Sequence, residues 1–146
     1  MATVLLLNGP NLNSLGLREP DIYGHTTLQE IEDGVRRLIE DGGHELRSIQ
    51  SNYEGELLDW LHHNRDASFA LVNAAGLTTT SVSLRDALKA VAIPFVEIHI
   101  SNVYAREPFR QHSYLSDIAQ GLIVGMGAQG YDLAAQFALE FLKRSP

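Results

Sequence analysis

Short runs of consecutive apolar residues alternate along the chain with longer segments in which apolar residues recur at helical spacing. Consecutive apolar residues are typical of strands buried on both faces of a sheet, and helical spacing is typical of helices with one buried face. The run Glu45–Ile49 is the least apolar and suits an edge strand. The predicted strands are Thr3–Leu7, Glu45–Ile49, Phe69–Val72, Phe95–Ile100 and Gly121–Val124.

The segment Thr27–Asp41 is the clearest predicted helix. Its apolar residues fall on one stripe, Thr27 and Glu30 form the sequence of a capping box, and Gly42–Gly43 provides a stop. The other predicted helices are Glu54–Arg65, Ser81–Val91 and Leu133–Leu142, with a short one over Tyr114–Gln120.

Strands and helices therefore alternate over the whole chain. This alternation predicts an α/β fold with a parallel sheet and right-handed crossovers, which place helices on both faces. A five-stranded parallel sheet of this kind is expected to take the flavodoxin-like strand order. The 146 residues contain no repeat, low-complexity segment or linker, so we expect residues 1–146 to form a single domain.

Composition narrows the classes of partner. The formal charge is −7 and the sequence pI is near 5.2. A nucleic acid or an anionic membrane requires a basic surface, so neither is expected as the main partner. The chain has no Cys, which excludes disulfides and thiolate metal sites. It also lacks a long apolar run and a basic leader at its start, so we expect a cytoplasmic protein.

Polar residues cluster after three of the predicted strands. The stretch NGPNLNSLGLREPDIYG follows the first, Asn73 follows the third, and His99 with ISNVYAREPFRQHSY ends the fourth. In a flavodoxin-like order these strands are neighbours, and ligands bind outside the carboxyl ends of the strands in such sheets. We therefore expect these groups to converge on one cleft.

Several of these residues also have ordinary structural explanations. Asn11 and Asn13 suit turns, because Asn tolerates left-handed backbone. Tyr23 could be a packed aromatic with a solvated hydroxyl, and His99 could be a buried core histidine, since it continues the apolar run VEIHI. Solvation or pairing with nearby acids could equally account for Arg18, Arg106 and Arg110.

Other patterns resemble sites but have the wrong context. The glycines of GMGAQG spell GxGxxG, yet they follow the last strand, so we interpret them as a tight turn and close packing. Lys89 and Lys143 are poorly placed for a Schiff base, and His62–His63 lacks metal-ligand spacing. A set of Tyr, His, Asn and Arg remains. It suits metal-free and cofactor-free proton transfer on a small anionic polyol or keto acid.

Four blocks of the sequence together resemble the type II 3-dehydroquinate dehydratases: LLLNGPNLNSLGLREPDIYG, QSNYEGELLDWLH, TSVSLRDAL and VEIHISNVYAREPFRQHSYLSDIAQGLIVGMGAQGY. The resemblance covers nearly the whole chain. It implies a flavodoxin-like subunit in a dodecamer of four trimers. It also implies reversible trans-dehydration of 3-dehydroquinate to 3-dehydroshikimate through an enolate, without metal or Schiff base, in the shikimate pathway of aromatic amino acid biosynthesis or in quinate catabolism.

The resemblance also implies roles for the reacting groups. Tyr23 would remove the proton alpha to the ketone, with Arg18 nearby to favour its phenolate form. Asn11 would hold a water that stabilises the enolate. His99 would protonate the departing C1 hydroxyl, and Glu97 would orient His99.

Substrate binding would fall, by the same resemblance, to residues of the later blocks. The backbone at Ile100 and Ser101 would hold the carboxylate. Asn73 and Arg110 would bind ring hydroxyls, and Asp86 would reach across from a neighbouring subunit. The opening stretch, residues 8–24, would be a strand-end cradle that runs into a mobile lid.

Arg106 lies in the same block as Arg110, and the resemblance implies that it orients the lid. One position departs from the family pattern: Thr79 stands in AAGLTTTS where a substrate-binding His is expected. A milder departure is Ser14, where the family often has Leu. The change at Thr79 keeps a second interpretation open, in which the chain is a family paralogue with altered or lost activity.

Overall fold

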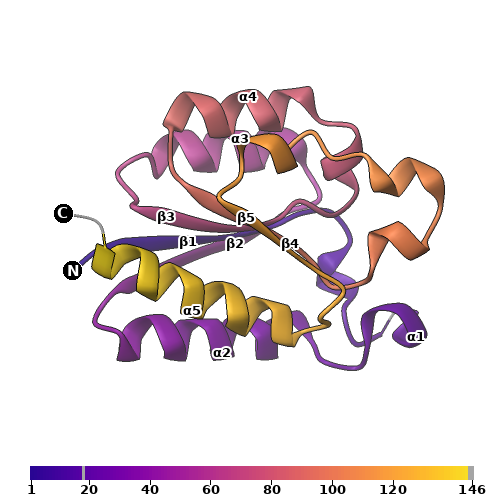
Figure 1. Cartoon of the computed structure of the whole chain (residues 1–146), viewed down its shortest axis with the longest axis horizontal. Helices are drawn as coiled ribbons and strands as arrows, with labels where there is room; N and C mark the ends of the chain where they lie inside the picture. Colours follow the sequence, from indigo (N-terminus) through magenta and orange to yellow (C-terminus); the bar gives the residue numbers. More distant parts are fainter. Residues whose placement is uncertain (18, 145–146) are drawn as a thin grey trace.

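A computed structural model of the chain describes residues 1–17 and 19–144 and contains one five-stranded parallel sheet. Its order is β2-β1-β3-β4-β5, which is the predicted flavodoxin-like order, with β2 at one edge as expected (Figure 1). The strands are β1 (Thr3–Asn8), β2 (Glu45–Gln50), β3 (Phe69–Asn73), β4 (Phe95–His99) and β5 (Gly121–Val124).

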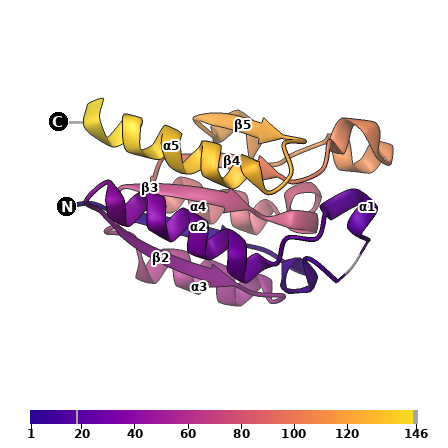
Figure 2. The same cartoon turned by 90° about the horizontal axis from the view of Figure 1, so that it is seen from below.

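Helices cover both faces of the sheet. The helices α2 (Leu28–Asp41) and α5 (Gln129–Arg144) lie side by side on one face, as Figure 2 shows. The helices α3 (Glu54–His63) and α4 (Val82–Val91) pack together on the other face. The short helix α1 (Pro20–Tyr23) lies beyond the carboxyl ends of the strands.

Each face of the sheet forms its own apolar core. Alternate residues of β1 separate the two, because Val4 and Leu6 contact the α2–α5 layer while Leu5 and Leu7 contact the α3–α4 layer. All four are fully buried, as expected for a central parallel strand. No helix of residues 1–17 and 19–144 is long and apolar enough to cross a membrane.

The predicted helix boundaries are mostly correct. The capping box is formed, since Glu30 N–H donates to Thr27 Oγ1 and Thr27 N–H donates to the Glu30 carboxylate. Ser81 caps α4 by accepting from Leu84 N–H over 2.8 Å. The predicted helix Leu133–Leu142 is longer in the structure, and Tyr114–Gln120 contains only the 3₁₀ turn η5 (Ser116–Ile118).

The early start of α5 follows from the glycines of GMGAQG. Gly125 and Gly127 have φ values of +84° and +62°, which form the turn that leaves β5. A Cβ at Gly130 would lie 3.2 Å from Ile123 Cγ2, so the helix packs directly on β5. The interpretation of these glycines as a turn and a close approach is therefore confirmed.

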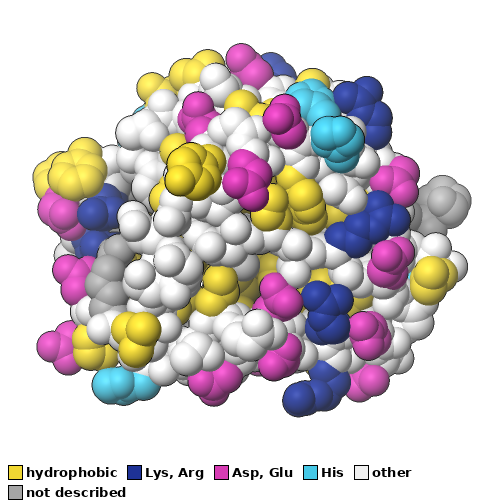
Figure 3. Space-filling model, turned by 180° about the vertical axis from the view of Figure 1, so that it is seen from behind, with side chains coloured by type: hydrophobic (Ala, Val, Ile, Leu, Met, Phe, Trp, Pro, Cys, Tyr) yellow, Lys and Arg dark blue, Asp and Glu magenta, His cyan; other side chains and the backbone are white. Residues whose placement is uncertain are grey.

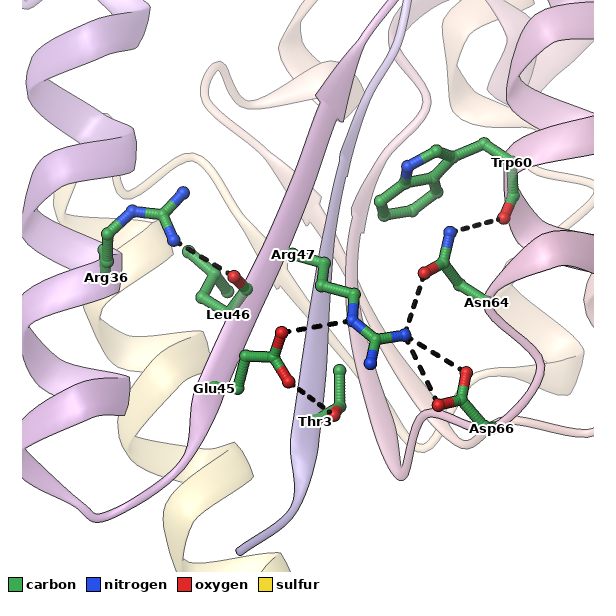
Figure 4. Close-up of polar contacts among 8 residues, drawn as sticks. All are labelled: Thr3, Arg36, Glu45, Leu46, Arg47, Trp60, Asn64 and Asp66. Carbon is green, nitrogen blue, oxygen red and sulfur yellow. Dashed lines mark hydrogen bonds and ion pairs between the residues drawn. The ribbon is translucent and has the colours of Figure 1, made fainter.

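Arginine side chains secure the edge strand β2 on both of its faces (Figure 4). Arg47 bonds the Glu45 carboxylate over 3.3 Å, Asn64 Oδ1 over 3.0 Å and Asp66 Oδ1 over 3.1 Å. From α2, Arg36 Nη1 donates to the Leu46 carbonyl over 3.0 Å. On the face drawn in Figure 3, acidic and basic side chains are interspersed.

Candidate active site

A cavity of about 190 Å³ lies at the carboxyl ends of β1, β3 and β4. Loops after all three strands contribute to its wall, so the predicted convergence is found in the structure. The sequence-predicted site residues that line it are Asn11, Tyr23, Asn73, Thr79, His99, Ile100, Ser101, Arg106 and Arg110. Ser14 and Thr78 also line it.

Two of the predicted site residues that the structure describes do not line the cavity. Glu97 is buried behind His99 rather than in the cavity wall. Asp86 is exposed on α4 and does not line the cavity of its own chain. Arg18 lies outside the described residues. Neither Lys89 nor Lys143 lines the cavity, and both side chains are exposed.

His99 and Glu97 form a buried pair at the end of β4. His99 Nε2 lies 2.5 Å from Glu97 Oε2, and Glu97 is only 1% exposed. Burial alone would raise the pKa of the Glu97 carboxyl, but hydrogen bonds from His99, Ser116 and Ser113 outweigh it and lower that pKa below its usual value. Alternation along a strand places both side chains on the same side of β4, which is why residues two apart can pair.

Tyr23 ends the short helix α1 and faces a cation. The guanidinium of Arg106 lies 5.3 Å from the centre of the Tyr23 ring, and Arg106 Nη1 donates to Ser101 Oγ over 3.1 Å. The ring of Tyr23 also packs against the apolar core on the α2–α5 side. The ordinary explanation of Tyr23 as a packed aromatic therefore holds beside its place in the cavity.

Asn73 is held from behind by two residues that sequence reasoning missed. Asn73 Nδ2 donates to the Tyr131 hydroxyl over 2.8 Å, and that hydroxyl donates to Asn8 Oδ1 over 2.7 Å. Tyr131 is fully buried, and burial raises the pKa of its hydroxyl despite the hydrogen bond from Asn73. The signal in the sequence was partial, because Asn8 ends the run LLLN but Tyr131 lies before Leu133, where the predicted helix began.

Tight backbone geometry shapes the cavity floor. Ala75 has a φ of +53°, which costs a residue with a Cβ about 1–2 kcal/mol, and its N–H donates to Asn73 Oδ1 over 3.1 Å. A Cβ at Gly9 would lie 2.4 Å from the Ala74 carbonyl oxygen. Asn11 is left-handed at φ +70°, so its role in a turn is real, and its N–H donates to Asn52 Oδ1 over 2.9 Å.

The threonines of the loop after β3 differ in their partners. Thr79 Oγ1 donates to the Gly76 carbonyl over 3.1 Å, within its own 3₁₀ turn η2 (Ala75–Thr79). Thr78 Oγ1 is buried and has no hydrogen-bond partner among the described residues. The hydroxyl of Thr79 is therefore directed to the loop backbone.

The cavity combines a histidine–carboxylate pair, a tyrosine beside a cation and further arginine and amide groups. These groups can bind an anion and transfer protons, as acid–base catalysis on a small molecule requires. A flavodoxin-like fold with such a cavity at the carboxyl edge of its sheet is that of a small-molecule enzyme.

Comparison with known proteins identifies the family. The family model described as dehydroquinase class II matches residues 2–139. The 3-dehydroquinate dehydratase of Halorhodospira halophila is 59% identical over 141 residues, 95% of each chain, and the 3-dehydroquinate dehydratase 1 of Pseudomonas aeruginosa is 56% identical over 146 residues, 99% of each. The type II dehydroquinase structure from Propionibacterium acnes superposes with a TM-score of 0.89 at 35% identity, over 96% of this chain and 97% of that one. The chain belongs to the class II dehydroquinase family.

Proposed function

We propose that the chain catalyses the reversible trans-dehydration of 3-dehydroquinate to 3-dehydroshikimate. The observation that carries the proposal is the convergence of Tyr23 and the His99–Glu97 pair on one cavity in a member of this family. The two groups reach the cavity from different segments, α1 and the end of β4, so they can act on different atoms of a bound ring.

The first step is removal of the proton alpha to the ketone. Tyr23, as phenolate, takes this proton and the C–H electrons pass into an enolate. A cation favours the phenolate, and we assign this role to Arg18, with Arg106 beside the ring as a second positive charge. Asn11 holds a water that donates to the enolate oxygen.

The second step is loss of the hydroxyl from C1. His99 donates a proton to the departing oxygen, the C–O bond breaks with release of water, and the enolate electrons form the new C=C bond. Glu97 orients His99 and stabilises its protonated form. The lowered pKa of Glu97 supports this role, since the carboxylate stays charged at neutral pH. No metal, cofactor or lysine imine takes part in either step.

Binding groups for the substrate follow the cavity wall. The backbone at Ile100 and Ser101 takes the carboxylate, while Asn73 and Arg110 bind ring hydroxyls. Asp86 is exposed and does not line the cavity of its own chain, which supports its assignment to a neighbour's site. We accordingly propose a homo-oligomer, a dodecamer of four trimers, as the active form.

Turnover of purified 3-dehydroquinate tests the proposal directly. The conjugated enone of the product absorbs in the ultraviolet, so absorbance should rise on mixing and the product should match 3-dehydroshikimate by mass. Light scattering on the same sample should give at least a trimer. Absence of turnover in a folded oligomer would refute the proposed function, and an active monomer would refute the place of Asp86.

A second candidate function is favoured by the position of the two departures from the family pattern. Both Ser14 and Thr79 line the cavity, so both can change which ligand fits. The alternative is therefore a paralogue that acts on a related cyclic acid or only binds one. Thermal stabilisation by 3-dehydroquinate without turnover would favour this alternative.

A further inference from the structure

The loop before β5 brings two serines onto the buried carboxylate of Glu97. Ser116 Oγ lies 2.7 Å from Glu97 Oε1, and Ser113 Oγ lies 3.1 Å from both Oε1 and Oε2. Together with His99 Nε2, this gives the carboxylate three partners in a site where it is 1% exposed. Sequence reasoning gave neither serine a role.

The direction of the Ser113 bond follows from its other contacts. Ser113 Oγ accepts from Leu115 N–H over 3.0 Å and from Ser116 N–H over 3.1 Å. A hydroxyl has two lone pairs and one proton, so both lone pairs are occupied and only the proton remains for Glu97. Ser113 is therefore an obligatory donor to the carboxylate.

Ser116 reinforces this arrangement from the next turn. The N–H of Ser116 donates to Ser113 Oγ, and the Ser116 hydroxyl has Glu97 as its partner among the described residues. Donors on a buried carboxylate favour the charged form over the protonated one. Glu97 is then an acceptor on both oxygens, and His99 Nε2 must be the third donor.

A fixed donor at Nε2 determines which ring nitrogen does the chemistry. If Nε2 of His99 always keeps the proton that it donates to Glu97, then Nδ1 is the ring nitrogen that gains or loses a proton. No bond to Nδ1 is found among the described residues, and His99 lines the cavity. Nδ1 is thus the nitrogen available to a ligand.

We propose that Ser113 and Ser116 are positioning residues that hold Glu97 as an anion and thereby keep the His99 proton on Nε2, leaving Nδ1 as the acid. The role in turnover rests on the proposed function. In the second step the Nδ1–H bond breaks, the proton joins the departing C1 oxygen, and His99 remains neutral with Nε2–H in place.

Few other charges act on Glu97. His99 is the titratable group in contact with it, and the serine hydroxyls do not ionise in the accessible pH range. Arg85 and Asp117 pack on the same loop but pair with each other, and Arg85 also donates to the Tyr114 carbonyl over 2.8 Å. NMR signals of Glu97 and His99 therefore report on this pair, whereas turnover at low pH also requires Tyr23 as a phenolate.

Ser116→Ala is the sharpest variant, because it removes one donor and leaves no N–H without an acceptor. The pKa of Glu97 should rise, since the anion loses a donor. The Glu97 carboxyl should then titrate at a higher pH in Ser116→Ala than in wild type, which carbon-13 NMR of the carboxyl measures. At neutral pH we expect kcat to fall about tenfold with KM within about twofold, because a bond to a charged group is lost.

Matched variants separate positioning from simple structural damage. Ser116→Thr keeps the hydroxyl and should restore the wild-type profile, and Ser68→Ala, exposed ahead of β3 at the opposite edge, should change nothing. Ser113→Ala should act like Ser116→Ala or more strongly, but it also leaves two N–H groups unpaired. If Ser113→Ala fails to fold, Ser116→Ala alone tests the proposal.

Nitrogen-15 NMR of histidine in the substrate-free protein reads the tautomer without turnover. Wild type should show Nε2–H on neutral His99, and Ser116→Ala should show a mixture with Nδ1–H. An unchanged tautomer together with an unchanged titration of the Glu97 carboxyl in Ser116→Ala would overturn the proposal. If wild type has the Nε2–H form and loses it in the variant but does not turn over 3-dehydroquinate, positioning is supported and the proposed function fails.

Discussion

The hydroxyl of Tyr131 donates to Oδ1 of Asn8 over 2.7 Å, although 123 residues separate the two along the chain. The bond joins the last helix to the end of the first strand, directly behind the cavity. The same hydroxyl accepts from Asn73, which lines the cavity. One buried oxygen thus orients two amides, and one of them, Asn73, lines the cavity.

Tyr131→Phe should therefore affect both stability and binding. The ring fits the same space, but both amides lose a partner in a buried place, so the free energy of unfolding should fall by about 1–3 kcal/mol. Urea denaturation measures this loss. Because Asn73 Nδ2 loses its acceptor and only the bond from Ala75 N–H still orients the amide, KM should rise more than kcat falls. An unchanged urea midpoint and an unchanged KM would show that this network is dispensable.

Tyr23→Phe tests the base. The ring and its contacts with the core remain, so the fold should survive, while kcat should fall by at least the roughly 10²–10⁴-fold typical of an acid–base group. Circular dichroism and the urea midpoint provide the control for folding. Near-normal turnover in a folded variant would contradict the assignment of Tyr23 as the base.

His99→Ala should separate the two steps. The acid serves only the departure of the hydroxyl, so exchange of the proton alpha to the ketone with deuterated solvent should survive better than dehydration. NMR of the substrate pool follows exchange, and absorbance follows dehydration. Equal loss of both rates would argue against the division of roles between Tyr23 and His99.

Thr79→His tests the departure in the loop after β3. Thr79 Oγ1 is engaged by Gly76, so it is poorly placed to serve a ligand, whereas an imidazole can reach further into the cavity. We expect kcat/KM on 3-dehydroquinate to rise by roughly two- to a hundredfold, the worth of one hydrogen bond or of one unpaired polar group. A slower His variant of a fast wild type would mean that the loop has been rebuilt around Thr79.

Borohydride reduction tests the absence of an imine. Lys89 and Lys143 are exposed and lie away from the cavity, so reduction in the presence of substrate should leave the protein mass unchanged. Mass spectrometry of the intact chain makes the measurement. A mass gain that matches reduced ligand would contradict the proposed mechanism.

The sequence predicted best what depends on local pattern. The apolar runs gave the strands, and the capping box of Thr27 and Glu30 gave the start of α2, because both effects act over neighbouring residues. The start of α5 was placed too late, since a prediction from apolar spacing does not see the turn that Gly125 and Gly127 make at positive φ.

The candidate site was predicted unevenly for a physical reason. Residues at the ends of strands, such as Asn73 and His99, follow from topology alone, because parallel strands end at the same edge. Tyr131, Ser113 and Ser116 do not, since their roles depend on which buried atom each hydroxyl reaches. The distance between each hydroxyl and its buried partner is set by packing between elements far apart in the chain.

The contact between Arg36 and the Leu46 carbonyl has a consequence for how copies of the chain can meet. The N–H groups of Glu45 and Ser51 donate to the carbonyls of Ala2 and Asn8, at the two ends of β1. Alternation along β2 therefore turns the carbonyl of Leu46 to the open edge of the sheet. Such an acceptor invites a strand from another molecule to add itself, which is the usual route to edge-to-edge aggregation. With Arg36 already donating to this carbonyl, β2 offers an incoming strand one hydrogen bond fewer, which disfavours extension of the sheet from β2.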